Sequence, residues 1–216
     1  MKPARRVIGV DESGKGDFFG PLVVASFMAD DSALATLKGS GVKDGKLIAD
    51  RRIIEIDQSL RRDFPHAVVV INPREYNTVY EKIKNLNKLL GEGHARAIDE
   101  LLDRHDADLA ISDKFGKPER IQDALTAKGR TIELKQIVRG ESILQVAAAS
   151  ILARARYLKE MEALSDMYGF ELPRGAAARV DEAGRKFTAL HGIEALSQVA
   201  KLHFKNYHRI VNPRLL

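Results

Sequence analysis

The chain has 216 residues, enough for one domain with a buried core, so a disordered tail or a mini-scaffold does not fit it. Hydrophobic residues make up 44% and charged residues 30%, as in ordinary globular enzymes, and the absence of Cys excludes disulfides, zinc fingers, iron–sulfur clusters and thiol nucleophiles. The formal net charge of +5 permits a polyanionic partner without requiring one.

The uncharged runs of the sequence are too short to cross a membrane. The longest, 18–29 and 142–153, have twelve residues each, whereas a membrane span needs roughly 18 to 20. The N-terminus carries Lys2, Arg5 and Arg6 but continues into a strand-like segment without the apolar stretch of a signal peptide. We therefore expect a cytoplasmic protein with no membrane association.

Apolar runs and helical spacing predict alternating strands and helices along the chain. Strands are expected over 7–10, 21–28, 67–71, 107–112 and 131–138. Helices are expected over 47–60, from 76 to a break at 91–93, and over 94–104, 141–163, 182–190 and 193–203. This order predicts an α/β fold with a mixed β-sheet flanked by helices. We expect residues 1–216 to form one domain, with a helical C-terminal part from about 164 to 216.

Two adjacent carboxylates, Asp11 and Glu12, follow the first predicted strand. Burying them there without a partner is unfavourable, because desolvation and mutual repulsion both oppose ionisation. A hard divalent cation would remove that cost. Gly14 and Gly16 let the backbone approach a sugar-phosphate chain, with the charge of Lys15 between them. A polar hairpin turn explains the same residues about equally well.

Two further carboxylates occupy comparable places. Asp113 ends the predicted strand 107–112, and Glu141 opens the predicted helix 141–163, whose apolar face it leads, so that it should point toward the sheet. A turn cap for Asp113 and a dipole-complementing residue for Glu141 are the ordinary alternatives. Together with Asp11 and Glu12, these residues form the oxygen-rich set that a two-metal phosphoryl-transfer site for Mg²⁺ or Mn²⁺ needs.

Residues 9–16 come within one residue of the Walker A pattern G-x-x-x-x-G-K-[ST]. Gly16 stands where a hydroxyl should bind Mg²⁺, and Asp11 and Glu12 would face the phosphates. Pro21 also interrupts the helix that should follow. The sequence therefore disfavours a nucleotide-hydrolysing loop.

The last sixteen residues contain cations but no acid: Lys201, Lys205, Arg209 and Arg214. This composition is typical of a phosphate-contacting surface and equally of a solvated, basic helix end. If the surface contacts phosphates, neutralising Lys205 and Arg209 should lower the salt dependence of nucleic-acid binding.

Taken together, these motifs resemble the type 2 ribonucleases H, and in particular the catalytic domain of ribonuclease HIII. The similar opening motif is 11–22, with the Gly-Lys-Gly form in place of the Gly-Arg-Gly form usual in ribonuclease HII. Similar segments follow in the same order, namely Asn77 to His94, Asp113 to Phe115, Glu141 with Val146 to Arg154, and Lys201 to Asn206.

The resemblance implies a ribonuclease H-like fold and a Mg²⁺- or Mn²⁺-dependent endoribonuclease. Such an enzyme cuts the RNA strand of RNA/DNA hybrids and leaves 5′-phosphate and 3′-hydroxyl ends. By the same resemblance, the catalytic metal ligands are Asp11, Glu12, Asp113 and Glu141. The substrate-binding residues that it implies are Ser13, Gly14, Lys15, Gly16, Lys46 and Ser150, of which 13–16 would read the ribose 2′-hydroxyl groups. We expect the hybrid to be the partner of a monomeric enzyme.

Three features depart from the family pattern. Only ten residues precede Asp11, whereas ribonuclease HIII usually carries an N-terminal domain resembling the TATA-box-binding fold, so that domain is expected to be absent. Gly45 replaces the usual Ser, and Ala176 stands where ribonuclease HII has a Tyr that stacks near a DNA–RNA junction. We therefore expect cutting within runs of ribonucleotides. Ribonuclease HII-like cutting at single ribonucleotides and a non-catalytic hybrid-binding module are the alternatives.

Overall fold

The structure, a computed structural model, describes residues 5–39, 42 and 48–212. Within this part of the chain the backbone forms two compact units. The sheet unit comprises Met1–Ser13, Val23–Val69 and Asn85–Arg156. The helical unit comprises Gly14–Leu22, Val70–Lys84 and Tyr157–Leu216.

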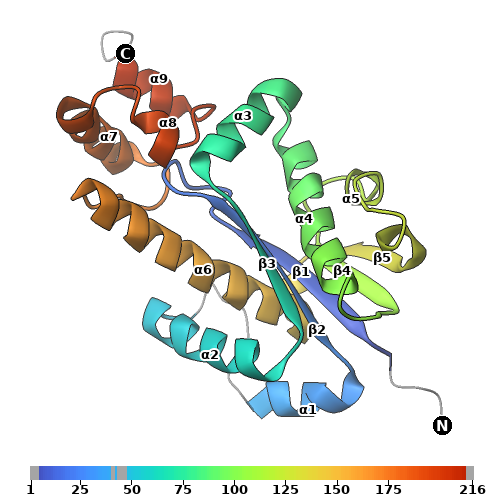
Figure 1. The fold of residues 1–216 in the computed structure, drawn as a ribbon. Helices are drawn as coiled ribbons and strands as arrows, with labels where there is room; N and C mark the ends of the chain where they lie inside the picture. The colour runs from blue at the N-terminus through green and yellow to red at the C-terminus, as the bar shows by residue number, and fades with distance from the viewer. Residues whose placement is uncertain (1–4, 40–41, 43–47, 213–216) are drawn as a thin grey trace. The chain divides into compact units, whose positions relative to one another are not determined.

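Five strands in the described residues form one mixed sheet, in the order β3-β2-β1-β4-β5 (Figure 1). The central strand β1 is antiparallel to β2 and parallel to β4, which is itself parallel to β5. The mixed sheet predicted from the sequence is therefore confirmed. The strands are β1 (Val7–Ser13), β2 (Leu22–Ala29), β3 (His66–Ile71), β4 (Leu109–Asp113) and β5 (Glu133–Ile137).

Helices make up most of the remaining described chain. Those of the sheet unit are α1 (Asp31–Gly39), α2 (Asp50–Asp63), α4 (Leu86–Leu102), α5 (Glu119–Gln122) and the 3₁₀ turns η2 (Gly129–Thr131) and η3 (Gly140–Ser142). Those of the helical unit are α3 (Pro73–Ile83), α7 (Ala178–His191), α8 (Leu196–Val199) and α9 (Lys205–Val211). The long helix α6 (Leu144–Tyr168) contributes to both units. Among the described residues, no helix is both long and apolar enough to span a membrane.

In the sheet unit, α6 and α4 cover opposite faces of the sheet (Figure 1). Gly9 lies on the α6 face, where an added Cβ would sit 2.1 Å from the carbonyl carbon of Gln145. Only glycine therefore allows α6 to approach β1 this closely. Phe27 is the strand partner of Gly9, so its neighbour Ser26 points to the other face. There the Ser26 hydroxyl donates a hydrogen bond of 2.6 Å to the Ala97 carbonyl of α4.

The break between α3 and α4 lies earlier than predicted. Lys84 adopts a left-handed conformation with φ 42°, and the Asn85 side chain accepts a hydrogen bond from the Lys88 N–H at 3.1 Å. This cap begins a new helix. Gly91 and Gly93, which predicted the break, lie buried inside α4. Tertiary packing of this helix overrides the weak helix propensity of glycine.

Two other helix predictions are wrong at their boundaries. Glu141 does not open a long helix, because 140–142 form the 3₁₀ turn η3 and α6 begins at Leu144. The predicted helix 193–203 is reduced to the four residues of α8. Beyond it, Ala200 leaves the helical conformation and pairs with Phe19 in an antiparallel bridge.

Candidate active site

Asp11 and Asp113 lie at the same level of two neighbouring parallel strands. The register places Val10 beside Ser112, and each carboxylate is the next residue along its strand. Burial, then the charge of Glu12 and, to a lesser extent, the charge of Asp113 raise the pKa of Asp11, which reaches about 7. Hydrogen bonds from the Glu12 N–H and from the Ser150 side chain act in the opposite direction. The structure thus brings Asp11, Asp113 and Ser150 together on the α6 side of the sheet.

The turn that carries Glu141 is attached to Asp113. The Gly140 N–H donates to Asp113 Oδ1 at 3.0 Å, and Glu141 follows as the partly buried central residue of η3. The backbone therefore brings the fourth candidate carboxylate next to the third. It does so through a 3₁₀ turn and not through the first turn of α6.

Glu12 faces the opposite side of the sheet, because successive strand residues alternate between faces. Its Oε2 lies 3.0 Å from His94 Nε2 of α4, and the two side chains are 6% and 0% exposed. His94 Nδ1 lies 3.2 Å from Ser112 Oγ, and the ring of Phe115 packs at 4.7 Å between ring centroids. Sequence reasoning assigned His94 no role, although it lies at the end of the family-like segment 77–94.

The four candidate ligands offer only carboxylate oxygens, which suit a hard cation such as Mg²⁺ or Mn²⁺. Burial and then the repulsion between the carboxylates raise the pKa of Asp11, and such a cation would remove this cost of ionisation. Over residues 5–39, 42 and 48–212, no three His, Asp or Glu side chains are gathered closely enough to hold an ion. The chemistry of the donors therefore fits the cation, while Glu12 in this structure is engaged with His94.

The loop after β1 contains two glycines with different environments. Gly14 is buried with φ +85°, and an added Cβ would lie 2.3 Å from a backbone oxygen. Gly16 is exposed, and nothing lies within 4 Å of a Cβ built on it. Ser13 and Lys15 beside them are partly buried. Because packing does not require glycine at position 16, the backbone there is open to the close approach of a ligand.

Of the other implied substrate-binding residues, Ser150 lies on α6 in contact with Asp11. Lys46, together with Gly45, lies outside the described residues.

The C-terminal cations considered from the sequence have different environments in the structure. Lys201 is fully buried, and Arg209 pairs with Asp181 at 2.6 Å. Lys205 is exposed, and Arg214 lies outside the described residues. Since Asp181 pairs with Arg209, Lys205 is the more exposed cation of the two, and the hypothesis that neutralising both lowers the salt dependence of binding stays a prediction.

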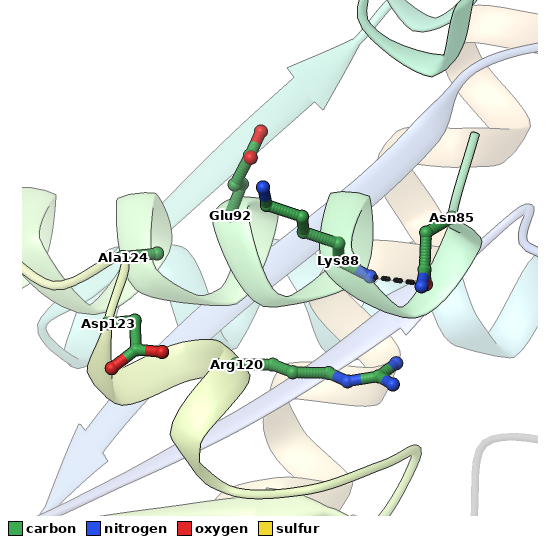
Figure 2. Close-up of a pocket in the computed structure, with 6 residues that line it drawn as sticks. All are labelled: Asn85, Lys88, Glu92, Arg120, Asp123 and Ala124. Atoms are coloured by element: carbon green, nitrogen blue, oxygen red, sulfur yellow. Dashed lines mark hydrogen bonds between the residues drawn. The ribbon is translucent and has the colours of Figure 1, made fainter. Parts of the chain in front are cut away.

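A separate pocket of about 550 Å³ lies between α4 and α5 in the sheet unit (Figure 2). Its cations are matched by two carboxylates, and none of the candidate metal ligands lines it. The pocket is therefore distinct from the carboxylate site. Its lining residues are Asn85, Lys88, Glu92, Arg120, Asp123 and Ala124.

Comparison with known proteins gives consistent matches over nearly the whole chain. Residues 8–207 match the family model described as Ribonuclease HII. Ribonuclease HIII of Chlamydia felis is 41% identical over 206 residues, which cover 94% of this chain and 69% of that protein. Ribonuclease HIII of Chlamydia abortus is 40% identical, covering 97% and 71% respectively. The crystal structure of Bst-RNase HIII in complex with Mn²⁺ matches with a TM-score of 0.90 at 35% identity, covering 98% of this chain and 71% of that one.

The mixed sheet carries carboxylates near the ends of β1 and β4, and the fold matches a ribonuclease HIII structure with a TM-score of 0.90. These features identify a ribonuclease H-like enzyme. The chain belongs to the ribonuclease HII family of type 2 ribonucleases H, and within that family its curated relatives are ribonucleases HIII. It is accordingly an endoribonuclease of the ribonuclease H type. The predictions of fold, family and enzyme class are confirmed, and the non-catalytic module is set aside.

Proposed function

We propose that this enzyme cuts the RNA strand of RNA/DNA hybrids with Mg²⁺ or Mn²⁺ held by Asp11, Glu12, Asp113 and Glu141. The observation that carries the proposal is the placement of Asp11 beside Asp113, with the turn of Glu141 fixed to Asp113. The Mn²⁺ complex of Bst-RNase HIII supports the choice of metal. Bound as a pair, such cations would activate a water and stabilise the leaving oxygen, giving 5′-phosphate and 3′-hydroxyl ends.

The residues around the carboxylates hold them in place. The Glu12 N–H donates to Asp11 Oδ1 at 2.8 Å, and the Gly140 N–H donates to Asp113 Oδ1 at 3.0 Å. Each of these carboxylates keeps further lone pairs that a cation could use. These two hydrogen bonds orient Asp11 and Asp113 before substrate arrives. The contact with His94 holds the Glu12 carboxylate on the α4 side of the sheet, from which it would turn to share a cation with them.

We assign substrate recognition to residues 13–16, Lys46 and Ser150. Gly16 is exposed and unobstructed, so a ribose 2′-hydroxyl can approach the backbone there. Lys15 supplies a cation beside it for the phosphates. Ser150 touches Asp11 and would therefore lie near the reacting phosphate.

We further propose that residues 1–216 act as one catalytic domain, as a monomer. The family match supports the single catalytic domain because it runs through both compact units. A hybrid-cutting enzyme works where hybrids form, which for this chain we propose to be the cytoplasm. Continuous ribonucleotide runs are the proposed substrate, because the matched relatives are ribonucleases HIII.

A 5′-labelled RNA strand annealed to DNA tests this reaction. With Mg²⁺ or Mn²⁺ the enzyme should cut the RNA, and a polymerase should extend the upstream fragment because it ends in a 3′-hydroxyl. Chelation by EDTA, or the substitution Asp11→Asn, should each lower the rate at least about 100-fold, because both remove the charge stabilisation of the reacting phosphate. Cutting that persists in EDTA, or fragments that end in a cyclic phosphate, would contradict the proposal.

A further inference from the structure

Lys201, between α8 and α9 in the helical unit, is a fully buried lysine. Its Nζ donates to the carbonyl oxygens of Asp17 at 2.8 Å and Gly20 at 2.7 Å. It also lies 5.7 Å from the ring centroid of Tyr76. A buried ammonium is unfavourable unless its N–H groups find acceptors. Here two backbone carbonyls and the face of an aromatic ring receive them.

The backbone of the same segment holds the same loop. The Lys201 N–H donates to the Phe18 carbonyl at 2.8 Å, and the Gly20 N–H donates to the Val199 carbonyl at 2.8 Å. An isolated antiparallel bridge lies between these two bonds. Residues 17–20 and 199–201 therefore form a short antiparallel ladder. The Lys201 side chain adds its own two hydrogen bonds to the same loop.

The number of donors matches this geometry in either protonation state. Burial lowers the pKa of Lys201 to about 7, and the charge of Asp17 acts in the opposite direction. An ammonium has three N–H groups and a neutral amine has two, so both forms can reach two carbonyls. The contact with the loop therefore does not depend on a full positive charge.

We propose that Lys201 is a positioning residue for the substrate loop, defined as residues 14–20. By holding the carbonyls of Asp17 and Gly20, it fixes the backbone that presents Gly16 to the RNA strand. Lys201 itself, being buried, does not touch the nucleic acid. This inference rests on the proposed function, in which residues 13–16 recognise ribose. A loop ordered in advance binds more tightly, because its conformational entropy is already lost on folding.

Two substitutions of Lys201 by residues of similar size distinguish the effect of its N–H donors from the effect of its side-chain volume. Lys201→Met removes every N–H donor, whereas Lys201→Gln keeps two without the charge. Hydrogen–deuterium exchange is measured on the protein alone, without nucleic acid. We expect Lys201→Met to speed exchange of the substrate-loop amides at least about tenfold while β1 and β4 keep the parental rates. Lys201→Gln should change the exchange rates of the substrate-loop amides much less. Unchanged loop exchange in Lys201→Met would overturn the proposal.

Kinetics on a continuous hybrid supply the second readout. Lys201→Met should raise KM about tenfold with kcat within about twofold, because the loop must be ordered on binding. The matched control Lys205→Met removes an equal charge at an exposed position and should leave loop exchange unchanged. Hybrid binding by Lys201→Met should keep the parental salt dependence. A slope reduced by about 1 would overturn the proposal, since Lys201 would then contact a phosphate.

Failure of the proposed function is distinguishable from failure of this inference. If the parent protein cuts no hybrid, the proposed function is wrong, while the exchange experiment still decides whether Lys201 holds the loop. If Lys201→Met does not fold, loop exchange and KM of Lys201→Gln decide whether Lys201 holds the substrate loop. Parental exchange and KM in that variant would show that two donors suffice, whereas a loosened loop with unchanged KM would overturn the proposal.

Discussion

At the residue scale, Gly14 and Gly16 are glycines for different reasons, and the difference can be measured. Gly14 has φ +85° and no room for a Cβ, so Gly14→Ala should lower the free energy of unfolding by about 1 to 3 kcal/mol. Gly16→Ala meets open space and should change it by less than about 0.5 kcal/mol. Its methyl group would nevertheless obstruct the RNA backbone, so hybrid cleavage should fall about tenfold or more.

Thermal unfolding and cleavage rates, taken on the same preparations, check both expectations. A Gly16→Ala enzyme that is as active as the parent would show that the loop does not meet the substrate at this position.

His94 should affect catalysis through its hydrogen bond to Glu12. His94→Phe keeps an aromatic ring in the buried site but leaves the Glu12 carboxylate without this donor, so kcat should fall about 10- to 100-fold. His94→Gln retains an N–H donor and should recover part of the loss. Steady-state kinetics with a chemical-unfolding control measure the effect. Equal kcat in His94→Phe and the parent would contradict a role in orienting Glu12.

Part of this site could be predicted from the sequence. Asp11 and Asp113 each follow a short apolar strand, and that local pattern indicates a carboxylate at a sheet end. The partner of Glu12 could not be predicted, because His94 lies 82 residues further along and sits in an otherwise ordinary helix. The burial of Lys201 was equally hidden, since a lysine among other cations resembles a solvated surface.

At the scale of elements, the buried strands could be predicted because they are continuous apolar runs bounded by turn residues. Helix ends were less predictable, because they depend on individual capping contacts. The break between α3 and α4 rests on a left-handed Lys84 and the Asn85 cap, and neither residue type requires that conformation. The end of α8 rests on the pairing of Ala200 with Phe19, which is a tertiary contact.

The segment between α8 and α9, through Lys201, should also make the free energy of unfolding depend on pH. Because burial lowers the pKa of Lys201 to about 7 from its ordinary 10.5, the unfolded chain binds a proton in this window that the folded chain has lost. The free energy of unfolding therefore rises with pH through the window, by up to about 1.4 kcal/mol per unit. Burial raises the pKa of the neighbouring Tyr76 hydroxyl, so that group titrates above the window.

Lys201→Met removes this contribution. The unfolding free energy of the parent minus that of the variant should therefore increase from pH 7 to pH 9.5, as measured by denaturant titration. A difference that stays constant would contradict a buried, titrating Lys201.

At the scale of the whole chain, the four candidate carboxylates belong to the sheet unit, and the first segment of the helical unit begins at Gly14. The family could be predicted because similar segments occur in the same order throughout the sequence. The division into two units could not, since no linker or shift in composition marks it and both units combine separate stretches of chain. The chain accounts for 69% and 71% of the lengths of its two Chlamydia relatives.

The most direct test of the central claim compares two end-labelled duplexes, one with a continuous RNA strand and one with a single ribonucleotide in DNA. Both are incubated in Mg²⁺ and in Mn²⁺ with the parent enzyme and with Asp113→Asn. We predict cutting of the continuous RNA strand, loss of that cutting in the variant, and little cutting at the single ribonucleotide. Efficient cutting at the single ribonucleotide, or none of either duplex in both metals, would contradict the account.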